Sequence, residues 1–114
     1  MSILTGEGDG TYYAPISFTV PAHPISMVIG DVNHDNKIEI MTANYLNQNV
    51  SVLRQVVDST FEVAGNYSLV HEPSEWPLSI AVGDVNGDGF ADIVTGNELS
   101  NDISVLLGNN DCSF

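Results

Sequence analysis

The sequence predicts an all-β fold, and three observations lead to this prediction. First, the 114-residue chain repeats itself, because residues 24–61 align without a gap to residues 77–114 and 16 of the 38 aligned positions are identical. Second, each copy consists of short runs of branched apolar residues separated by Gly, Asn, Asp and Pro, a pattern typical of strands and turns. Third, no stretch keeps the 3.6-residue apolar spacing of a helix over three turns.

Each repeat contains up to four strand-like runs. In the complete repeat these runs are residues 26–30, 39–43, 50–53 and 61–69, and the second copy contains the first three as 79–83, 92–95 and 103–107. Residues 2–12 match residues 51–61, so residues 12–20 are expected to be an earlier copy of the fourth strand. Four strands in about 50 residues are typical of a β-propeller blade. The alternative is a β-sandwich whose self-similarity arose by chance.

The repeat also predicts how the chain is organised. Residues 1–23 are expected to form the last two strands of one blade, residues 24–76 a complete repeat with its linker, and residues 77–114 a second repeat without its outer strand. Propellers close with about four to eight blades. We therefore expect a partial β-propeller of about two antiparallel four-stranded blades, which this chain alone does not close. We expect it to be a fragment of a larger propeller, a truncated gene product or a protomer that assembles with its own copies.

Composition restricts the partners. The chain has 15 acidic residues against two basic ones, Lys37 and Arg54, and a formal net charge of −13. Contacts to nucleic-acid phosphates or to anionic lipids need Lys and Arg, so both partners are excluded. No apolar run approaches the roughly 18 residues of a membrane span, and the N-terminal ten residues lack the pattern of a signal peptide. The single cysteine, Cys112, builds no disulfide framework, and cations are the expected partners.

The segment DVNGDGFAD at residues 84–92 carries the clearest chemistry. Oxygen-bearing side chains stand at its positions 1, 3, 5 and 9, and position 7 offers a backbone carbonyl. Hard oxygen donors at this density select Ca²⁺ or, less well, Mg²⁺, and glycine at position 6 allows the sharp bend. An EF-hand would need a bidentate acid at position 12, where this sequence has Thr95 in a strand-like run. The expected ligands are Asp84, Asn86, Asp88, Asp92 and the carbonyl of Phe90.

The first copy of this loop, DVNHDNKIE at residues 31–39, predicts a second calcium site. Its expected ligands are Asp31, Asn33, Asp35, Glu39 and the carbonyl of Lys37. Asn36 replaces the glycine and Glu39 replaces the aspartate, so we expect this site to be the weaker one. Without a bidentate twelfth ligand, affinities of about 10⁻⁴–10⁻³ M are expected for these loops.

The segment GDVNGDGFADIVTGN, followed by DISVLLGNNDCSF, resembles the FG-GAP/VCBS-type repeat of integrin-α-like β-propellers. The resemblance covers essentially the whole chain. It implies four-stranded blades with Ca²⁺ in the loop between the first and second strands, and an extracellular or cell-surface location for the full-length protein. It also implies that linkers share the face opposite the metal loops, where the family tends to bind ligands. These linkers are residues 19–24, 44–49, 68–77 and 97–102.

Two aromatic residues in these linkers, Tyr45 and Trp76, are candidates for a ligand-binding face. Trp76 would be either an exposed stacking platform for a sugar or partner, or a wedge packed between blades. The three histidines have no spacing suited to a transition-metal site and are expected to lie on the surface; they are His23, His34 and His71. Asn49 and Asn66 begin glycosylation sequons, which matter only in a secreted protein.

The leading functional hypothesis is a non-enzymatic, calcium-stabilised repeat segment that serves as a scaffold for extracellular adhesion or ligand recognition. The first alternative is a sugar-binding propeller lectin. The second is a domain of a polysaccharide-processing enzyme, for which the linker face offers few acid and base groups. These groups are His71, Glu72, Glu75 and Glu98. The chain shows no nucleophile elbow, and its GEGDG segment is expected to be a hairpin turn because no helix or GK[ST] follows it.

Overall fold

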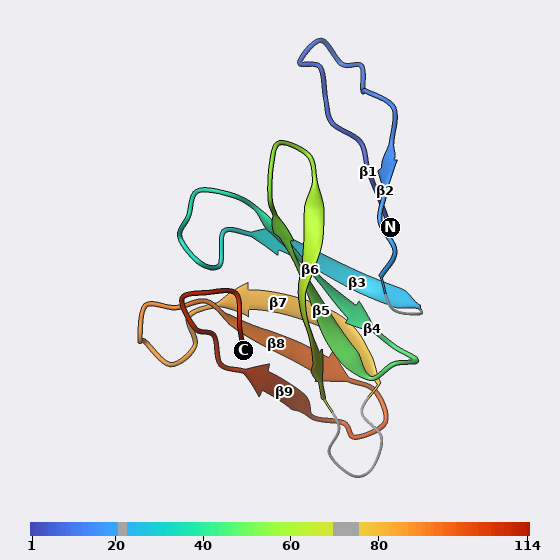
Figure 1. Ribbon diagram of the computed structural model, residues 1–114. Helices are drawn as coiled ribbons and strands as arrows, with labels where there is room; N and C mark the ends of the chain where they lie inside the picture. Colours follow the sequence, from blue (N-terminus) through green and yellow to red (C-terminus); the bar gives the residue numbers. More distant parts are fainter. Residues whose placement is uncertain (21–22, 70–75) are drawn as a thin grey trace.

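The computed structural model describes residues 1–20, 23–69 and 76–114 (Figure 1). In these residues the chain forms nine strands and no helix, in three antiparallel sheets whose strands lie side by side in sequence order. The described residues accordingly contain no helix that could span a membrane. The strands are β1 (Ser2–Ile3), β2 (Ile16–Ser17), β3 (Pro24–Gly30), β4 (Glu39–Asn44), β5 (Asn49–Gln55), β6 (Phe61–Ser68), β7 (Pro77–Gly83), β8 (Asp92–Asn97) and β9 (Ile103–Leu106).

The sheets contain two, four and three strands, in the orders β1-β2, β3-β4-β5-β6 and β7-β8-β9. They do not close into a ring, so the prediction of an all-β, partial propeller-like fold is confirmed. The two larger sheets share one detail of register. The pairing of β3 with β4 shifts between Pro24 and Ser26, and that of β7 with β8 shifts between Pro77 and Ser79. Proline has no N–H to donate to the ladder, which accounts for an irregularity at the start of both sheets.

The strand expected at residues 12–20 is much shorter than predicted. Only Ile16–Ser17 is paired along β1, with one isolated bridge between Gly6 and Tyr12. Its repeat equivalent, β6, has eight residues because it pairs along the full length of β5. The N-terminal hairpin instead projects from the larger sheets (Figure 1), and a ribbon of two strands gains little stability from its own pairing.

The hydrophobic core lies between the two larger sheets. Strand β7 packs against β3 and β4, and all six residues of β4 are buried. The buried apolar cluster draws on both sheets and on the segment after β9. Its members are Val32, Met41, Val50, Val52, Leu69, Ile93 and Cys112.

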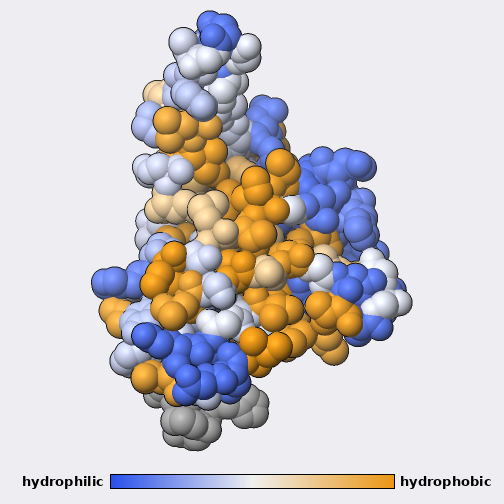
Figure 2. Space-filling view, turned by 180° about the vertical axis from the view of Figure 1, so that it is seen from behind, coloured by the Kyte–Doolittle hydropathy of each residue, from blue (hydrophilic) through white to orange (hydrophobic). Residues whose placement is uncertain are grey.

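Equivalent strands of the two sheets present opposite burial. Ile25, Met27 and Ile29 on β3 are exposed, whereas their repeat counterparts on β7 include Ile80 and Val82, which pack against the core. The third sheet does not cover the face of β3 that carries these three residues, and the short N-terminal sheet that lies near it leaves them exposed. Figure 2 shows apolar surface continuing over the back of the molecule below the N-terminal hairpin.

The segment after β9 folds back onto the middle sheet. Cys112 is 2% exposed, and its backbone carbonyl accepts a hydrogen bond of 3.1 Å from the Tyr67 hydroxyl. The Tyr67 and Phe114 rings meet edge to face with 5.5 Å between their centroids. Cys112 thus acts as a small core residue. Burial, followed by the nearby Glu39 carboxylate, raises the pKa of its thiol to about 11.

A buried polar network holds the hairpin end of each larger sheet. Asn44 accepts a hydrogen bond from Thr42 (3.1 Å) and donates to Asn49 and Ser51, both at 2.8 Å. The second sheet repeats this network at equivalent positions, with Thr95, Asn97, Asp102 and Ser104. Because buried polar groups need partners, the Thr-x-Asn pair and the polar residues of the following strand specify this hairpin. The network lies at the end of the sheets away from the acidic loops.

Candidate metal-binding loops

The two acidic loops have the same place in the fold. Residues 31–38 connect β3 to β4, and residues 84–91 connect β7 to β8, in each case as the first connection of a sheet. Figure 1 shows both loops projecting at the same end of the two packed sheets. The structure thus brings the two predicted sites to one end of the molecule.

In the second loop, side-chain oxygens bind the loop's own backbone. Asp84 accepts hydrogen bonds from the amides of Gly87 and Asp88 through Oδ1 and from Gly89 through Oδ2, at 2.7, 3.2 and 2.9 Å. Asn86 accepts from the Asp88 amide at 2.9 Å. These bonds wrap the loop around Asp84. Gly87 and Gly89 have φ angles of +80° and +90°, which side chains rarely adopt.

The first loop repeats this geometry with different turn residues. Asp31 accepts from the amides of Asp35 and Asn36 at 3.2 and 3.0 Å, and Asn33 also accepts from the Asp35 amide. His34 and Asn36 occupy the two glycine positions with φ angles of +60° and +64°. The loop therefore keeps its shape without glycine, as expected for Asn36 but at a conformational cost for His34.

The two loops differ at their ninth position. Asp92 is fully buried and both its oxygens are bonded, Oδ2 to the Val85 amide and Oδ1 to the Gly108 amide, each at 2.9 Å. Glu39 is also fully buried and accepts from the Val32 amide at 3.0 Å through Oε2, but its Oε1 has no partner. The second site thus has a satisfied buried carboxylate and the first has an orphaned oxygen.

These contacts shift the pKa values of Glu39 and Asp92 in opposite directions. Burial, and then the nearby Asp35 and Asp31 carboxylates, raise the pKa of Glu39 despite the hydrogen bond from Val32. The amides of Gly108 and Val85 lower the pKa of Asp92 because they stabilise its charged form. Additional positive charge near Glu39 would reverse the effect of its acidic neighbours.

Two predicted carbonyl donors also lie in these loops. The Lys37 amide donates to Asp35 at 2.8 Å, and its ammonium group reaches away to the Val56 carbonyl at 3.2 Å. Phe90 is half-buried and its amide donates to Asp88 at 2.8 Å. Each residue stands at the seventh position of its loop, two residues after the aspartate at the fifth position, as the predicted ligand spacing requires.

No three or more His, Cys, Asp or Glu side chains of the described residues are gathered closely enough to form a ready-made metal cluster. In both loops the carboxylates face backbone amides. Each carboxylate oxygen has two lone pairs, so one amide bond leaves it able to act as a ligand. The donor chemistry of both loops fits a hard divalent cation, and the orphaned Glu39 Oε1 marks a place where one would satisfy a buried oxygen.

A contact between the loops was not foreseen from the sequence. The His34 ring nitrogen Nε2 lies 3.2 Å from the carbonyl oxygen of Gly89. His34 is exposed as predicted, yet it touches the neighbouring loop. The hydrogen bond from the Gly108 amide to Asp92 was also missed, because nothing in the local sequence around Gly108 points to the second acidic loop. Gly108 could be found only by asking what satisfies a buried Asp92.

The opposite end of the sheets carries the predicted aromatic residues. The ring centroids of Tyr45 and Trp76 lie 4.9 Å apart, and the angle between the ring planes is 57°. The Tyr45 hydroxyl donates a hydrogen bond to Glu98 Oε2 at 3.0 Å. Tyr45 and Glu98 are equivalent positions of the two repeats, which is the signal that places them in neighbouring linkers. Burial, and then Glu98, raise the pKa of Tyr45. His71, Glu72 and Glu75 lie outside the described residues.

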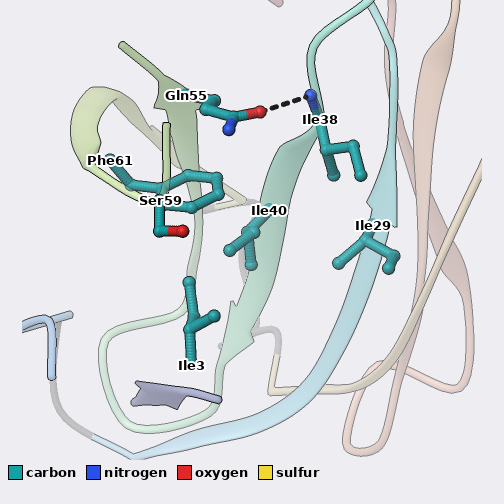
Figure 3. A pocket seen from close by; sticks show the side chains of 7 residues that line it. All are labelled: Ile3, Ile29, Ile38, Ile40, Gln55, Ser59 and Phe61. Carbon is teal, nitrogen blue, oxygen red and sulfur yellow. Dashed lines mark hydrogen bonds between the residues drawn. The ribbon is translucent and has the colours of Figure 1, made fainter. Parts of the chain in front are cut away.

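A separate apolar cavity of about 210 Å³ lies between β1 and the middle sheet (Figure 3). Ile3, Ile29, Ile40 and Phe61 point into it, and its polar lining is limited to Gln55 and Ser59. Gln55 accepts a hydrogen bond from the Ile38 amide. The cavity has no group of titratable side chains, so it is part of the open apolar face rather than a polar site.

Together, the antiparallel strand order that the two larger sheets share and the acidic loop after the first strand of each define a β-repeat with an acidic loop. A family model described as an FG-GAP-like repeat matches residues 31–95, more than half of the chain. The chain therefore belongs to the FG-GAP-like repeat family. No curated protein and no solved structure shows a significant match to it.

Proposed function

We propose that this chain is a non-enzymatic repeat scaffold whose two acidic loops bind Ca²⁺. The observation that supports this proposal best is the unpartnered, fully buried Oε1 of Glu39 beside Asp31 and Asp35. A buried carboxylate oxygen without a partner is costly, and a divalent cation would satisfy it. Oxygen-only donors favour Ca²⁺ over softer metals, and the irregular loop favours Ca²⁺ over octahedral Mg²⁺.

The ligands come from both loops in the same order. In the first loop they are Asp31, Asn33, Asp35, Glu39 and the Lys37 carbonyl; in the second they are Asp84, Asn86, Asp88, Asp92 and the Phe90 carbonyl. The cation would neutralise part of each acidic loop and hold the first two strands of each sheet in place. The metal would act as a structural link between these strands and not as a reaction centre.

Calcium-dependent stability tests this proposal. With dissociation constants of about 10⁻⁴–10⁻³ M, about 10 mM Ca²⁺ should raise the free energy of unfolding by about 1–3 kcal/mol per occupied loop. The melting temperature should then rise by several degrees. Asp31→Ala and Asp84→Ala should each remove part of this rise, and the double variant should remove it.

Asp9→Ala is the matched control for general screening of acidic charge. Asp9 accepts hydrogen bonds from the amide and hydroxyl of Thr11 in the N-terminal hairpin, outside both loops. Its calcium-dependent rise should equal that of the unaltered chain. A rise that persists in the Asp31/Asp84 double variant would mean that Ca²⁺ acts by screening alone, and the proposal would fail.

The structure adds an argument about which loop binds more tightly. The glycines of the second loop led us to expect the higher affinity there. Glu39 nevertheless has an oxygen to offer, whereas both Asp92 oxygens already accept amide bonds. Separate titrations of Asp31→Ala and Asp84→Ala decide the order, because each variant leaves one loop intact.

Recognition is proposed for the opposite end of the sheets, in an extracellular setting. The cluster of Tyr45, Trp76 and Glu98 combines aromatic surface with a carboxylate, which supports a protein or glycan ligand. The same combination also agrees with the lectin alternative. Trp76 is the only tryptophan, so its fluorescence reports on this cluster alone. A glycan that changes this fluorescence, and no longer does so in Glu98→Gln, would favour the lectin. Turnover of a polysaccharide would favour the enzyme alternative over the non-enzymatic scaffold.

The uncovered sheet faces form a further part of the proposed scaffold. Ile25, Met27 and Ile29 are exposed on β3, while the equivalent face of the third sheet packs against the middle sheet. Another unit of the same repeat would fit, from a larger propeller or from a second copy. Sedimentation of the chain with and without Ca²⁺ separates a calcium-dependent assembly of copies from a monomer.

A further inference from the structure

We infer that His34 couples the two acidic loops, so that a cation in one loop raises the affinity of the other. This inference rests on the calcium binding proposed above and assigns a positioning role to a residue that is not itself a ligand. It starts from the contact between His34 and Gly89, which joins two loops that are 55 residues apart in sequence.

The direction of the hydrogen bond is set by its acceptor. Gly89 offers a carbonyl oxygen, which can only accept, so the Nε2 atom of His34 must carry the hydrogen. The contact exists because β7 packs against β3 and β4, which brings the loops that follow β3 and β7 to the same end (Figure 1). It is therefore a tertiary contact and not a feature of either loop alone.

Both ends of this bridge are tied to expected ligands. The Gly89 carbonyl shares its peptide unit with the Phe90 amide, which donates to Asp88 Oδ1 at 2.8 Å, so the peptide that presents the carbonyl is positioned by an expected ligand of the second loop. His34 stands between Asn33 and Asp35, two expected ligands of the first loop. A cation that orders either loop fixes one end of the hydrogen bond, and the second loop then has less freedom to lose when it binds.

The backbone of His34 supports a role for its side chain. His34 adopts a φ angle of +60° at the position where the second loop has Gly87 at +80°. Glycine adopts this conformation without the steric cost that histidine carries. The loop geometry therefore gives no reason for histidine at this position, whereas the contact to Gly89 does.

Charge does not cancel the coupling. Each loop contains three carboxylates, namely Asp31, Asp35 and Glu39 in the first and Asp84, Asp88 and Asp92 in the second. Lys37 also stands in the first loop, so the net charge is −2 for the first loop and −3 for the second. One divalent cation therefore leaves the first loop neutral and the second loop with one negative charge, and neither loop becomes positive and repels a cation in the other. An exposed neutral hydrogen bond corresponds to a coupling of roughly twofold to tenfold in affinity, and linkage requires the effect to be the same in both directions.

The test is a calcium titration of the full chain, followed by NMR at constant pH. The amide of Asn36 reports on the first loop and that of Gly89 on the second. The calcium affinity of the first loop is measured in the unaltered chain and in Asp84→Ala. The first affinity divided by the second gives the coupling between the loops. We expect a ratio of about two to ten. In the His34→Gly background the same comparison should give a ratio near one.

His23→Gly is the matched control, because His23 also has a positive φ, of 58°, but lies in a linker outside both acidic loops. Its backbone carbonyl accepts a hydrogen bond from the Tyr45 amide. It should leave the ratio unchanged. His34→Asn, which tolerates the same backbone but has a shorter side chain, should behave like His34→Gly. Binding by both loops with a ratio of one, or an unaltered ratio in both His34 variants, overturns the coupling. If neither amide responds to Ca²⁺, the proposed function fails together with this inference.

Discussion

Replacing Gly108 by alanine tests the long-range contact that satisfies the buried Asp92 carboxylate. A Cβ atom at Gly108 would overlap the backbone carbonyl of Ala91, and Ala91 directly precedes Asp92. A backbone atom cannot move aside as the end of a flexible side chain can. The Gly108 segment must therefore shift, and its 2.9 Å amide bond to Asp92 Oδ1 must lengthen or break.

The expected loss follows from these two effects. Overpacking of a well-packed site costs about 1–3 kcal/mol, and the loss of a partner for a buried carboxylate oxygen adds to it. Gly83→Ala at the end of β7 is the matched control. Its Cβ would meet nothing within 4 Å, so its free energy of unfolding should stay within about 0.5 kcal/mol. Both changes reduce the freedom of the unfolded chain equally, so this contribution cancels in the comparison.

The assay is urea unfolding in a calcium chelator over a range of pH. The Gly108 amide is the main cause of the lowered pKa of Asp92. A lowered pKa contributes stability above the unfolded value of 3.8, and this contribution is lost as the pH falls through the folded value. The difference between Gly108→Ala and the unaltered chain should therefore narrow in acid. Equal stability of Gly108→Ala and Gly83→Ala at neutral pH would refute this reasoning.

Two further predictions concern buried polar groups. Asn44→Ala should lower the free energy of unfolding by about 2–3 kcal/mol because it leaves buried partners of the Asn44 network unsatisfied, whereas Asn47→Ala in the exposed turn should be close to neutral in the same urea assay. Glu39→Gln should flatten the pH dependence of stability in chelator. The raised pKa of Glu39 means that its stabilising contribution is present below 4.5 and is lost as the pH rises through the folded value, and glutamine cannot titrate. A variant as pH-dependent as the unaltered chain in that window would contradict the burial assigned to Glu39.

Much of the fold could be predicted because its strands and turns depend on local residue patterns. Short branched runs, the turn residues between them and the ungapped repeat predict antiparallel strands in sequence order, and the structure confirms them. The acidic loops could be located for the same reason, since their geometry depends on hydrogen bonds between residues two to five positions apart. The error at residues 12–20 shows the limit of this reasoning, because strand length depends on a partner strand that a local pattern does not contain.

The sequence by itself determined the repeat, the strand order and the oxygen donors of both loops, because these depend on neighbours along the chain. Only the tertiary structure decided which faces are covered. Ile29 and Val82 are equivalent in the repeat, yet Ile29 is exposed and Val82 packs against the core because the third sheet lies on one side of the middle sheet only. The same packing placed Gly89 beside His34 and left Glu39 with an unpartnered oxygen where Asp92 has the Gly108 amide. Two copies of one pattern thus acquire different surroundings, since burial and long-range hydrogen bonds depend on what packs against each copy.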